Sequence, residues 1–287
     1  MAVGILTCFY GYTVVFVAPK DFPVGKSFVI NEDESLKSIS GRLKEENIVT
    51  SALLFRAGVS FFEKDRYMQV GRYLFSTPTN LLGSISFFGN GHPTSPLLSV
   101  TIPEGSTSFE VATLVIKVMP TISSNIFSET ISNYNAEGKL FPSTYFLLPS
   151  YTAEEIVKLM LATFAKKVTP AIHEHILPPL TTEHDVLVLA SIVQGEAKSE
   201  EDMKMVAGIL LSRLTKGMPL QVDVAKETYK KKGLPVMPIN NPGLTAIGAV
   251  LYPTVTSYLF YITGDDGKMY YAKTFEEHKR NVRKYLR

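Results

Sequence analysis

The stretch LVLASIVQGEAKSEEDMKMVAGILLSRL, residues 187–214, predicts two helices and places an acid on a face that should be apolar. Leu189 and Val193 lie on one face of the first helix, and Glu196 extends that face by one step. A carboxylate in that place loses part of its hydration, which raises its pKa and suits a general acid working near neutral pH. The alternative is a helix-end glutamate that turns to solvent or pairs with a nearby cation such as Arg213.

The composition excludes several classes of protein. The chain has 287 residues, of which 45% are hydrophobic and 20% charged, enough for a sizeable core. The formal net charge is +2 and there is no dense stripe of Lys and Arg, so we expect no nucleic-acid partner. One cysteine and five histidines without an H-E-x-x-H pattern give no metal-binding motif, and no cofactor is implied.

The N-terminal residues 1–18 carry no charge and are followed by a linker at residues 19–26. This length is at the lower limit for a membrane-spanning helix, about 17–25 residues. We therefore predict an apolar anchor helix, which would make the protein a single-pass membrane protein with the rest of the chain on the extracytoplasmic side. A cleaved signal sequence and a buried core helix remain alternatives.

Residues 27–95 predict a small α+β module. SFVI begins it as a strand, two short helical patterns follow, and YMQVGRYLFS predicts a second strand. The order strand, helix, helix, strand resembles a LysM-type module, a fold that often binds glycan chains. The alternative is a spacer domain without a ligand.

Residues 96–287 predict a larger domain of mixed helices and strands, so the fold class is α+β. Its segment GMPLQVD, residues 217–223, predicts a strand in which Gln221 and Asp223 point to the same side. The loop GLPVMPINNPG follows and carries Asn241, whose amide could bind a sugar.

The C-terminal stretch predicts a β-hairpin followed by a helix. SYLFYIT and MYYAKT are joined by GDDG, a turn sequence. Thr274 is a plausible N-cap of the last helix, and His278 and Asn281 lie three residues apart on it.

These motifs, in this order, resemble the MltG (YceG-like) family of endolytic murein transglycosylases. They are ASI-V-x-x-E-A, A-G-x-x-x-x-R-L, L-Q-x-D, G-L-P…P-I-x-N-P-G and Y-A-x-T-x-E-E-H-x-x-N, with E-G-x-L-F-P upstream. The resemblance covers residues 27–287 and is strong in 137–287. It implies a membrane anchor, a LysM-like module and a lysozyme-like catalytic domain.

The resemblance also implies roles for single residues. The catalytic glutamate of the family falls on Glu196. The residues expected to bind substrate or to support the site are Gln194, Gln221, Asp223, Asn241, Thr274, His278 and Asn281. There are two departures, because Gln194 replaces the first acid of an E-x-E motif and Ser143 replaces the aspartate of F-P-D-T-Y. The stretch between Asp223 and Gly233 is also shorter than is usual in the family.

The implied reaction is cleavage of the MurNAc–GlcNAc bond of peptidoglycan with formation of 1,6-anhydroMurNAc and with Glu196 as sole acid and base. Such an enzyme would end the elongation of nascent glycan strands and would work beside cell-wall synthases. Two alternatives stay open. One is a hydrolytic muramidase with Asp223 as second carboxylate, and the other is a glycan-binding protein without catalysis.

Overall fold

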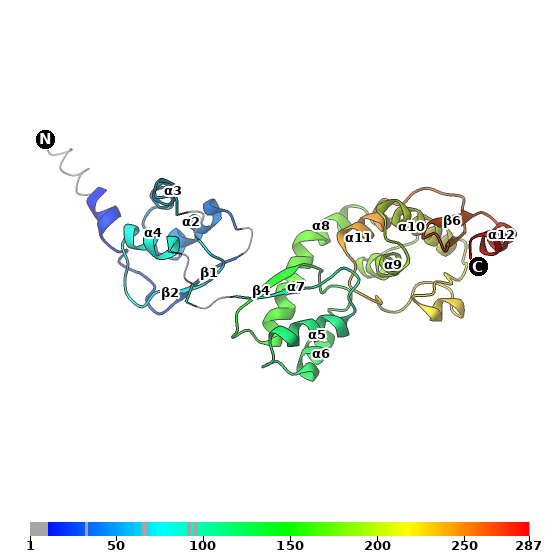
Figure 1. The fold of residues 1–287 in the computed structure, drawn as a ribbon, viewed down its shortest axis with the longest axis horizontal. Coiled ribbons are helices and arrows are strands. Elements are labelled where there is room, and N and C mark those ends of the chain that lie inside the picture. Colours follow the sequence, from blue (N-terminus) through cyan, green and yellow to red (C-terminus); the bar gives the residue numbers. More distant parts are fainter. Residues whose placement is uncertain (1–10, 32–33, 65–67, 91–92, 95–96, 287) are drawn as a thin grey trace. The chain divides into compact units, whose positions relative to one another are not determined.

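The structure is a computed structural model that describes residues 11–31, 34–64, 68–90, 93–94 and 97–286 (Figure 1). The chain divides into two compact units. Unit 1 comprises residues 1–99 and 146–150, and unit 2 comprises residues 100–145 and 151–287. Helices and short two-stranded sheets make up both units, so the predicted α+β class is confirmed.

Unit 1 contains the predicted order strand, helix, helix, strand. Its elements are β1 (Ser27–Ile30), α2 (Leu36–Glu45), α3 (Ala52–Phe61), β2 (Gly71–Leu74) and α4 (Leu81–Gly89). β1 and β2 pair antiparallel with Phe28 opposite Tyr73, and both side chains are buried. Helix α4 was not predicted, and it adds Phe88 to this aromatic core through ring contacts with Phe28, Phe55 and Tyr73. The likeness to a LysM module remains a prediction.

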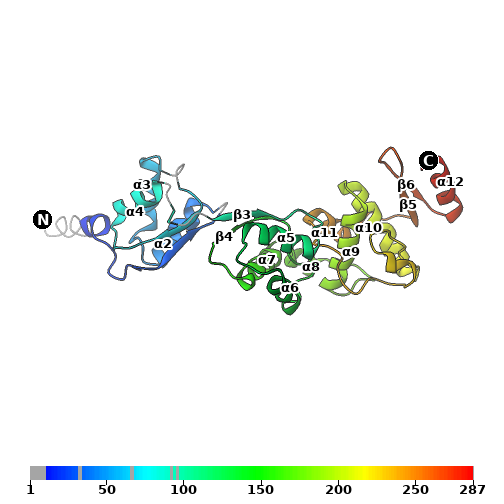
Figure 2. The ribbon, with the colours of Figure 1, turned by 60° about the horizontal axis from the view of Figure 1, so that its bottom comes forward.

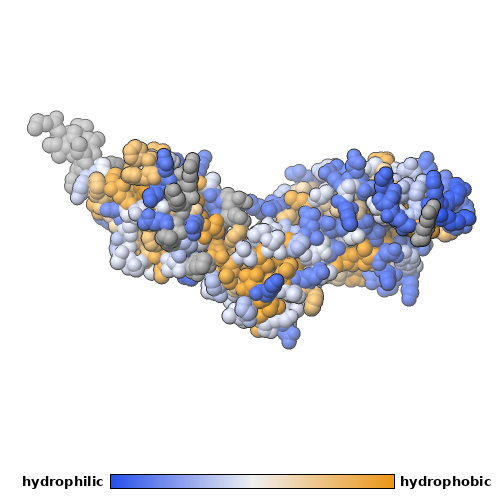
Figure 3. Space-filling model, viewed as in Figure 1, coloured by the Kyte–Doolittle hydropathy of each residue, from blue (hydrophilic) through white to orange (hydrophobic). Residues whose placement is uncertain are grey.

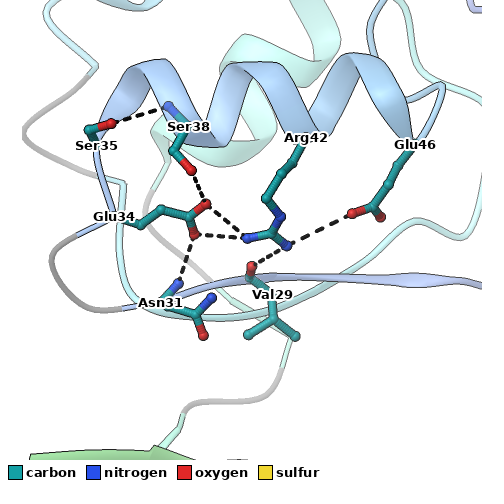
Figure 4. Close-up of polar contacts among 7 residues, drawn as sticks. All are labelled: Val29, Asn31, Glu34, Ser35, Ser38, Arg42 and Glu46. Atoms are coloured by element: carbon teal, nitrogen blue, oxygen red, sulfur yellow. Dashed lines mark hydrogen bonds and ion pairs between the residues drawn. The ribbon is translucent and has the colours of Figure 1, made fainter. Parts of the chain in front are cut away.

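An ion pair fixes α2 of unit 1 against β1 (Figure 4). Arg42 donates to both carboxylate oxygens of Glu34 at 2.9 Å and to the Val29 carbonyl at 3.0 Å. Its guanidinium lies 4.5 Å from the ring centroid of Phe28. Burial favours the neutral acid, but hydrogen bonds from Ser38 and Arg42 outweigh it and lower the pKa of Glu34.

Unit 2 is mostly helical. Its elements are α5 (Ser108–Val118), α6 (Ser124–Asn133), α7 (Ala153–Lys167), α8 (Thr169–Glu174), α9 (Glu183–Glu196), α10 (Glu200–Thr215), the 3-10 helix η2 (Lys226–Tyr229), α11 (Leu244–Leu251), β5 (Phe260–Thr263), β6 (Met269–Ala272) and α12 (Phe275–Tyr285). Two further strands, β3 (Leu98–Thr101) and β4 (Thr144–Leu147), pair with each other.

Helix α9 is the centre of the unit 2 core. It packs against α8, α10 and α11, and every residue from Val186 to Val193 is buried. The helix is therefore enclosed on all sides, rather than on the single face that the sequence predicted.

The predicted C-terminal hairpin and helix are confirmed. β5 and β6 pair antiparallel with Tyr261 opposite Tyr271, and α12 packs against both strands (Figure 2). Thr274 caps α12 by accepting from the Glu277 N–H, and Glu277 completes a capping box. No residue of α12 is fully buried, and Figure 3 shows mainly hydrophilic side chains around this helix.

Two predictions are wrong. In the parts of residues 11–286 that the structure describes, which omit 32–33, 65–67, 91–92 and 95–96, no helix is both long and apolar enough to span a bilayer, which contradicts the predicted single-pass membrane protein. Of the predicted anchor at residues 1–18, residues 1–10 lie outside the described residues, and residues 11–16 form a short helix. The strand predicted at residues 217–223 is instead a tight turn, because Gln221 adopts a φ of 51° and Val222 bridges only to Ala225.

Candidate active site

Glu196 is the last residue of α9, and its position follows from how that helix is built. Thr182 caps the start of α9 with a capping box, and Ala197 ends the helix in an extended conformation. The buried body of α9 holds its C-terminal end in place, and the side chain of Glu196 is half-buried there. Gly195 allows close packing, because a Cβ at this position would lie 3.0 Å from a methyl carbon of Val224.

The surroundings of Glu196 favour its protonated form. Burial is the largest influence and raises the pKa of this carboxyl, and the charge of Asp223 raises it further. The Val224 N–H, 3.5 Å from Oε1, and the hydroxyl of Tyr261 act in the opposite direction by hydrogen bonding. The net result is an acid that holds its proton to higher pH than an exposed glutamate does.

A cavity of about 530 Å³ opens beside this carboxyl. Its lining residues come from α9, α10, the 221–229 turn, the β5 strand and the C-terminal helix. They are Glu196, Arg213, Gln221, Asp223, Tyr229, Phe260, Tyr261, Ile262, Thr263, Phe275, His278 and Leu286. The volume is in the usual range for small-molecule sites, about 300–1,000 Å³.

The turn at residues 221–229 forms one wall of the cavity. The Val222 N–H donates to the Thr228 hydroxyl at 3.0 Å, which closes the turn on itself. Gln221 and Asp223 both line the cavity, although no strand alternation places them there. The Tyr229 hydroxyl donates to Asp223 Oδ1 at 2.8 Å and so fixes that carboxylate at the cavity wall.

His278 also lines the cavity and lies among aromatic rings. Its ring stacks with Phe260 at 5.5 Å and with Phe275 at 6.1 Å between centroids. Its Nδ1 is buried and has no hydrogen-bond partner among the described residues. Burial lowers the pKa of His278, and the positive charge of Arg213 lowers it further, so both favour the neutral imidazole.

Gln194 and Asn241 lie outside the cavity lining, in contacts between segments that are partly buried for Gln194 and fully buried for Asn241. Gln194 Oε1 accepts from the Gly243 N–H at 2.9 Å. Asn241 is fully buried, accepts from the Leu140 N–H at 2.8 Å and donates to the Ser106 carbonyl at 2.9 Å.

Thr274 and Asn281 likewise make contacts within the C-terminal segment. Thr274 is the cap of α12, and Asn281 Nδ2 donates to the Tyr271 carbonyl at 3.3 Å. The cavity therefore brings together Glu196, Gln221, Asp223 and His278, whereas the other four predicted residues lie in the surrounding framework.

Eight of the twelve lining residues were not predicted as site residues from the sequence, and the titratable ones among them are Arg213, Tyr229 and Tyr261. The sequence could have pointed to Arg213, because it lies at helical spacing from Val206 and Leu210 and so falls on the apolar, inward face of α10. Burial raises the pKa of Tyr261 well above its ordinary value, and the charge of Glu196 adds to this. The Tyr261 hydroxyl therefore keeps its proton near neutral pH and is a hydrogen-bond partner of the Glu196 carboxyl.

Within the described part of the chain, no group of three or more His, Cys, Asp or Glu side chains could hold a metal ion. The cavity is lined by a half-buried carboxyl (Glu196), a second carboxylate (Asp223), a guanidinium (Arg213) and two phenols (Tyr229 and Tyr261). This arrangement suits proton transfer to a bound polar substrate.

This site and fold belong to a known class. Residues 28–226 and 227–284 match the model of the YceG-like family, so the chain belongs to the YceG-like family and the predicted resemblance is confirmed.

Several known proteins resemble the chain over most of its length. It is 26% identical to an endolytic murein transglycosylase of Streptococcus pneumoniae serotype 2, over 96% of this chain and 62% of that protein. It is 24% identical to an endolytic murein transglycosylase of Bacillus subtilis (strain 168), over 96% of this chain and 89% of that protein. The crystal structure of a yceG-like protein from Listeria monocytogenes shares the fold with a TM-score of 0.55 at 23% identity, covering 89% of this chain and 98% of that one.

Proposed function

We propose that this protein is an endolytic lytic transglycosylase that cleaves the MurNAc–GlcNAc bond of peptidoglycan, with Glu196 as its sole general acid and base. The observation that carries the proposal is the raised pKa of a half-buried Glu196 in the wall of a cavity of about 530 Å³. The names of the pneumococcal and Bacillus subtilis relatives support the same activity.

The reaction needs only one group that first gives and then takes a proton. Protonated Glu196 donates to the glycosidic oxygen, the bond from C1 of MurNAc to that oxygen breaks, and GlcNAc leaves with a free 4-hydroxyl. The Glu196 carboxylate then removes the proton from the 6-hydroxyl of the same MurNAc, whose oxygen bonds to C1. The product is 1,6-anhydroMurNAc, no water is consumed, and the carboxyl returns to its protonated state.

The other cavity residues have supporting roles in this proposal. The Asp223 carboxylate stabilises the positive charge that develops at C1 as the bond breaks. Gln221 orients a sugar through its amide, which faces the same cavity. The Tyr261 hydroxyl holds the Glu196 carboxyl in one orientation through both proton transfers.

A cut inside a strand would also stop that strand from growing. We propose that the protein ends the elongation of nascent glycan strands and works close to cell-wall synthases. The word endolytic in the relatives' names supports a cut within the strand rather than at its end.

The test is digestion of isolated glycan strands by the full chain, with strand length as the readout. Glu196→Gln keeps the size and polarity of the side chain but cannot donate a proton, so we expect a loss of about 100-fold or more in rate. Glu201→Gln, an exposed glutamate on α10, is the matched control and should cut like the wild type. Full activity of Glu196→Gln would refute the proposal.

A hydrolytic muramidase is the second candidate, because a second carboxylate, Asp223, lines the same cavity. In that mechanism Asp223 would activate water or attack the sugar, and Asp223→Asn would abolish turnover. In the transglycosylase mechanism Asp223→Asn slows the reaction, but the products still carry anhydro ends. A protein that only binds glycan would leave strand length unchanged with every variant.

A further inference from the structure

Arg213 is a buried cation in the wall of the cavity. Its residue is 4% exposed, although it belongs to α10, whose next turn reaches the surface. The guanidinium makes hydrogen bonds to the carbonyl oxygens of Pro219 at 3.0 Å and Leu259 at 3.1 Å, and to Gln221 Oε1 at 2.6 Å. All three acceptors are neutral.

A buried cation without an anionic partner is costly. Among the described residues no carboxylate forms an ion pair with Arg213. Removing such a charge from water costs several kcal/mol. In a buried ion pair the attraction of the opposite charge offsets this cost, but Arg213 has no such partner among the described residues. A methionine or leucine would fill the same space on α10 without that cost, so the guanidinium has a purpose beyond packing.

The three acceptors belong to two segments that each contribute residues to the cavity lining. Pro219 and Gln221 lie in the segment 219–223, which leads into the 221–229 turn and carries Asp223, whereas Leu259 directly precedes β5. Leu259 and Tyr261 are two residues apart on an extended segment, so their side chains point to the same side of it. The hydrogen bond from Arg213 to the Leu259 carbonyl therefore also restrains the position from which Tyr261 contacts Glu196.

Gln221 requires such a restraint. Its φ of 51° is in the left-handed region, which is unfavourable for a residue with a side chain. The hydrogen bond from Arg213 to Gln221 Oε1 offsets part of that cost and directs the amide along the cavity wall. A planar guanidinium can make all three bonds at once, but a lysine ammonium on a flexible stem cannot reproduce this fork.

We infer that Arg213 is a positioning residue that joins the segment 219–223 to β5 and so sets the width of the cavity around Glu196. This inference rests on the proposed function for its catalytic consequence, but not for its structural one. Glu196 gains its geometry from Tyr261 on one side and from the turn on the other, and Arg213 is bonded to both sides.

The test compares Arg213→Lys with wild type in the full chain, by glycan cleavage kinetics and by amide hydrogen exchange. A small displacement of catalytic groups lowers the rate by up to about 100-fold, so we expect kcat to fall 10–100-fold while KM changes much less. Exchange should become faster in residues 219–223 and 259–263 and stay unchanged in α9. Arg42→Lys, which removes a similar fork in unit 1, is the control and should leave kcat unchanged.

A second variant covers the case in which lysine itself perturbs folding. Arg213→Ala leaves a space that added methylguanidinium can fill, and partial recovery of kcat at millimolar concentration would support positioning by the guanidinium. The inference is overturned if Arg213→Lys keeps the wild-type kcat, or if exchange rises throughout unit 2 instead of at the two walls.

The two proposals fail separately. A wild-type protein that cuts no glycan refutes the proposed function, and the exchange measurement still decides the role of Arg213. A wild-type protein that cuts while Arg213→Lys cuts equally well refutes only the role of Arg213.

Discussion

Asn241→Ala should destabilise unit 2 strongly, although Asn241 was predicted to bind substrate. The side chain is fully buried, with Oδ1 accepting from the Leu140 N–H and Nδ2 donating to the Ser106 carbonyl. The Ser106 carbonyl keeps a partner after the substitution, because the Asn241 backbone N–H also donates to it at 2.9 Å. The Leu140 N–H keeps none, and it becomes a buried donor without an acceptor.

The expected loss follows from these contacts. An orphaned buried N–H costs about 1–3 kcal/mol, and the second lost hydrogen bond costs about 1 kcal/mol. Together they give about 3 kcal/mol, which for a unit of this size lowers Tm by roughly 6–12 °C.

The neighbouring Asn240→Ala is the matched control. Asn240 is also buried and donates to the Ser191 carbonyl, but its Oδ1 has no hydrogen-bond partner among the described residues. Removing this amide loses one bond and also removes an unsatisfied acceptor, so we expect a loss of about 1 kcal/mol or less.

The assay is urea denaturation followed by far-UV circular dichroism, with kinetics on glycan strands alongside. We expect a lower midpoint and an unchanged slope for Asn241→Ala, and a KM near the wild-type value below the transition. The reasoning is refuted if both variants are equally stable and only Asn241→Ala raises KM, since the amide would then contact glycan.

Three further predictions concern caps, glycines and pH. Thr274→Ala and Thr152→Ala each remove a capping box and should each lower the free energy of unfolding by about 1 kcal/mol. Only Thr274→Ala should lower kcat, because α12 carries His278. Equal kcat values for the two variants would contradict this prediction. Gly208→Ala should destabilise the protein by about 2 kcal/mol, because the new Cβ would lie 2.1 Å from the Thr254 carbonyl oxygen. Gly248→Ala, whose Cβ would meet no atom within 4 Å, should stabilise it by about 0.5–1 kcal/mol. Thermal unfolding of both variants tests this pair of predictions. Because the pKa of Glu196 is raised in the folded state, its charged form costs stability as pH rises above the ordinary value of 4.5. The difference in Tm between Glu196→Gln and wild type should therefore increase in favour of the variant from pH 4.5 upward, and it should level off above the pKa of Glu196 in the folded protein. A difference that decreases over this range would show that the fold stabilises the carboxylate instead.

Features that depend on neighbouring residues were predictable from the sequence. Thr274 begins α12 as predicted, because the capping box lies within four residues. The β5–β6 hairpin was also predicted, because its turn sequence lies between two short runs of strand-forming residues. Helical periodicity placed Glu196 on the face of Leu189 and Val193, although it did not predict that α9 is buried on all sides from Val186 to Val193.

Features that depend on distant residues were not predictable in this way. The pattern of Gln221 and Asp223 around Val222 suggested a strand, but the Thr228 hydroxyl binds the Val222 N–H and turns the chain back. Asn241 bonds to Leu140, 101 residues away, and Arg213 bonds to Leu259, 46 residues away, so neither contact leaves a periodic signal. Family motifs brought Asn241 to notice, but they did not separate residues of the framework from those that line the cavity.

The most direct measurement of the central claim is digestion of glycan strands by wild-type protein in ¹⁸O-labelled water, with mass spectrometry of the new ends. If Glu196 transfers both protons and the sugar's own 6-hydroxyl closes the ring, every new MurNAc end is lighter by one water than a hydrolytic end and carries no label. A new end with one ¹⁸O atom at each cut would show that water attacks C1, and would contradict the account of Glu196 as sole acid and base.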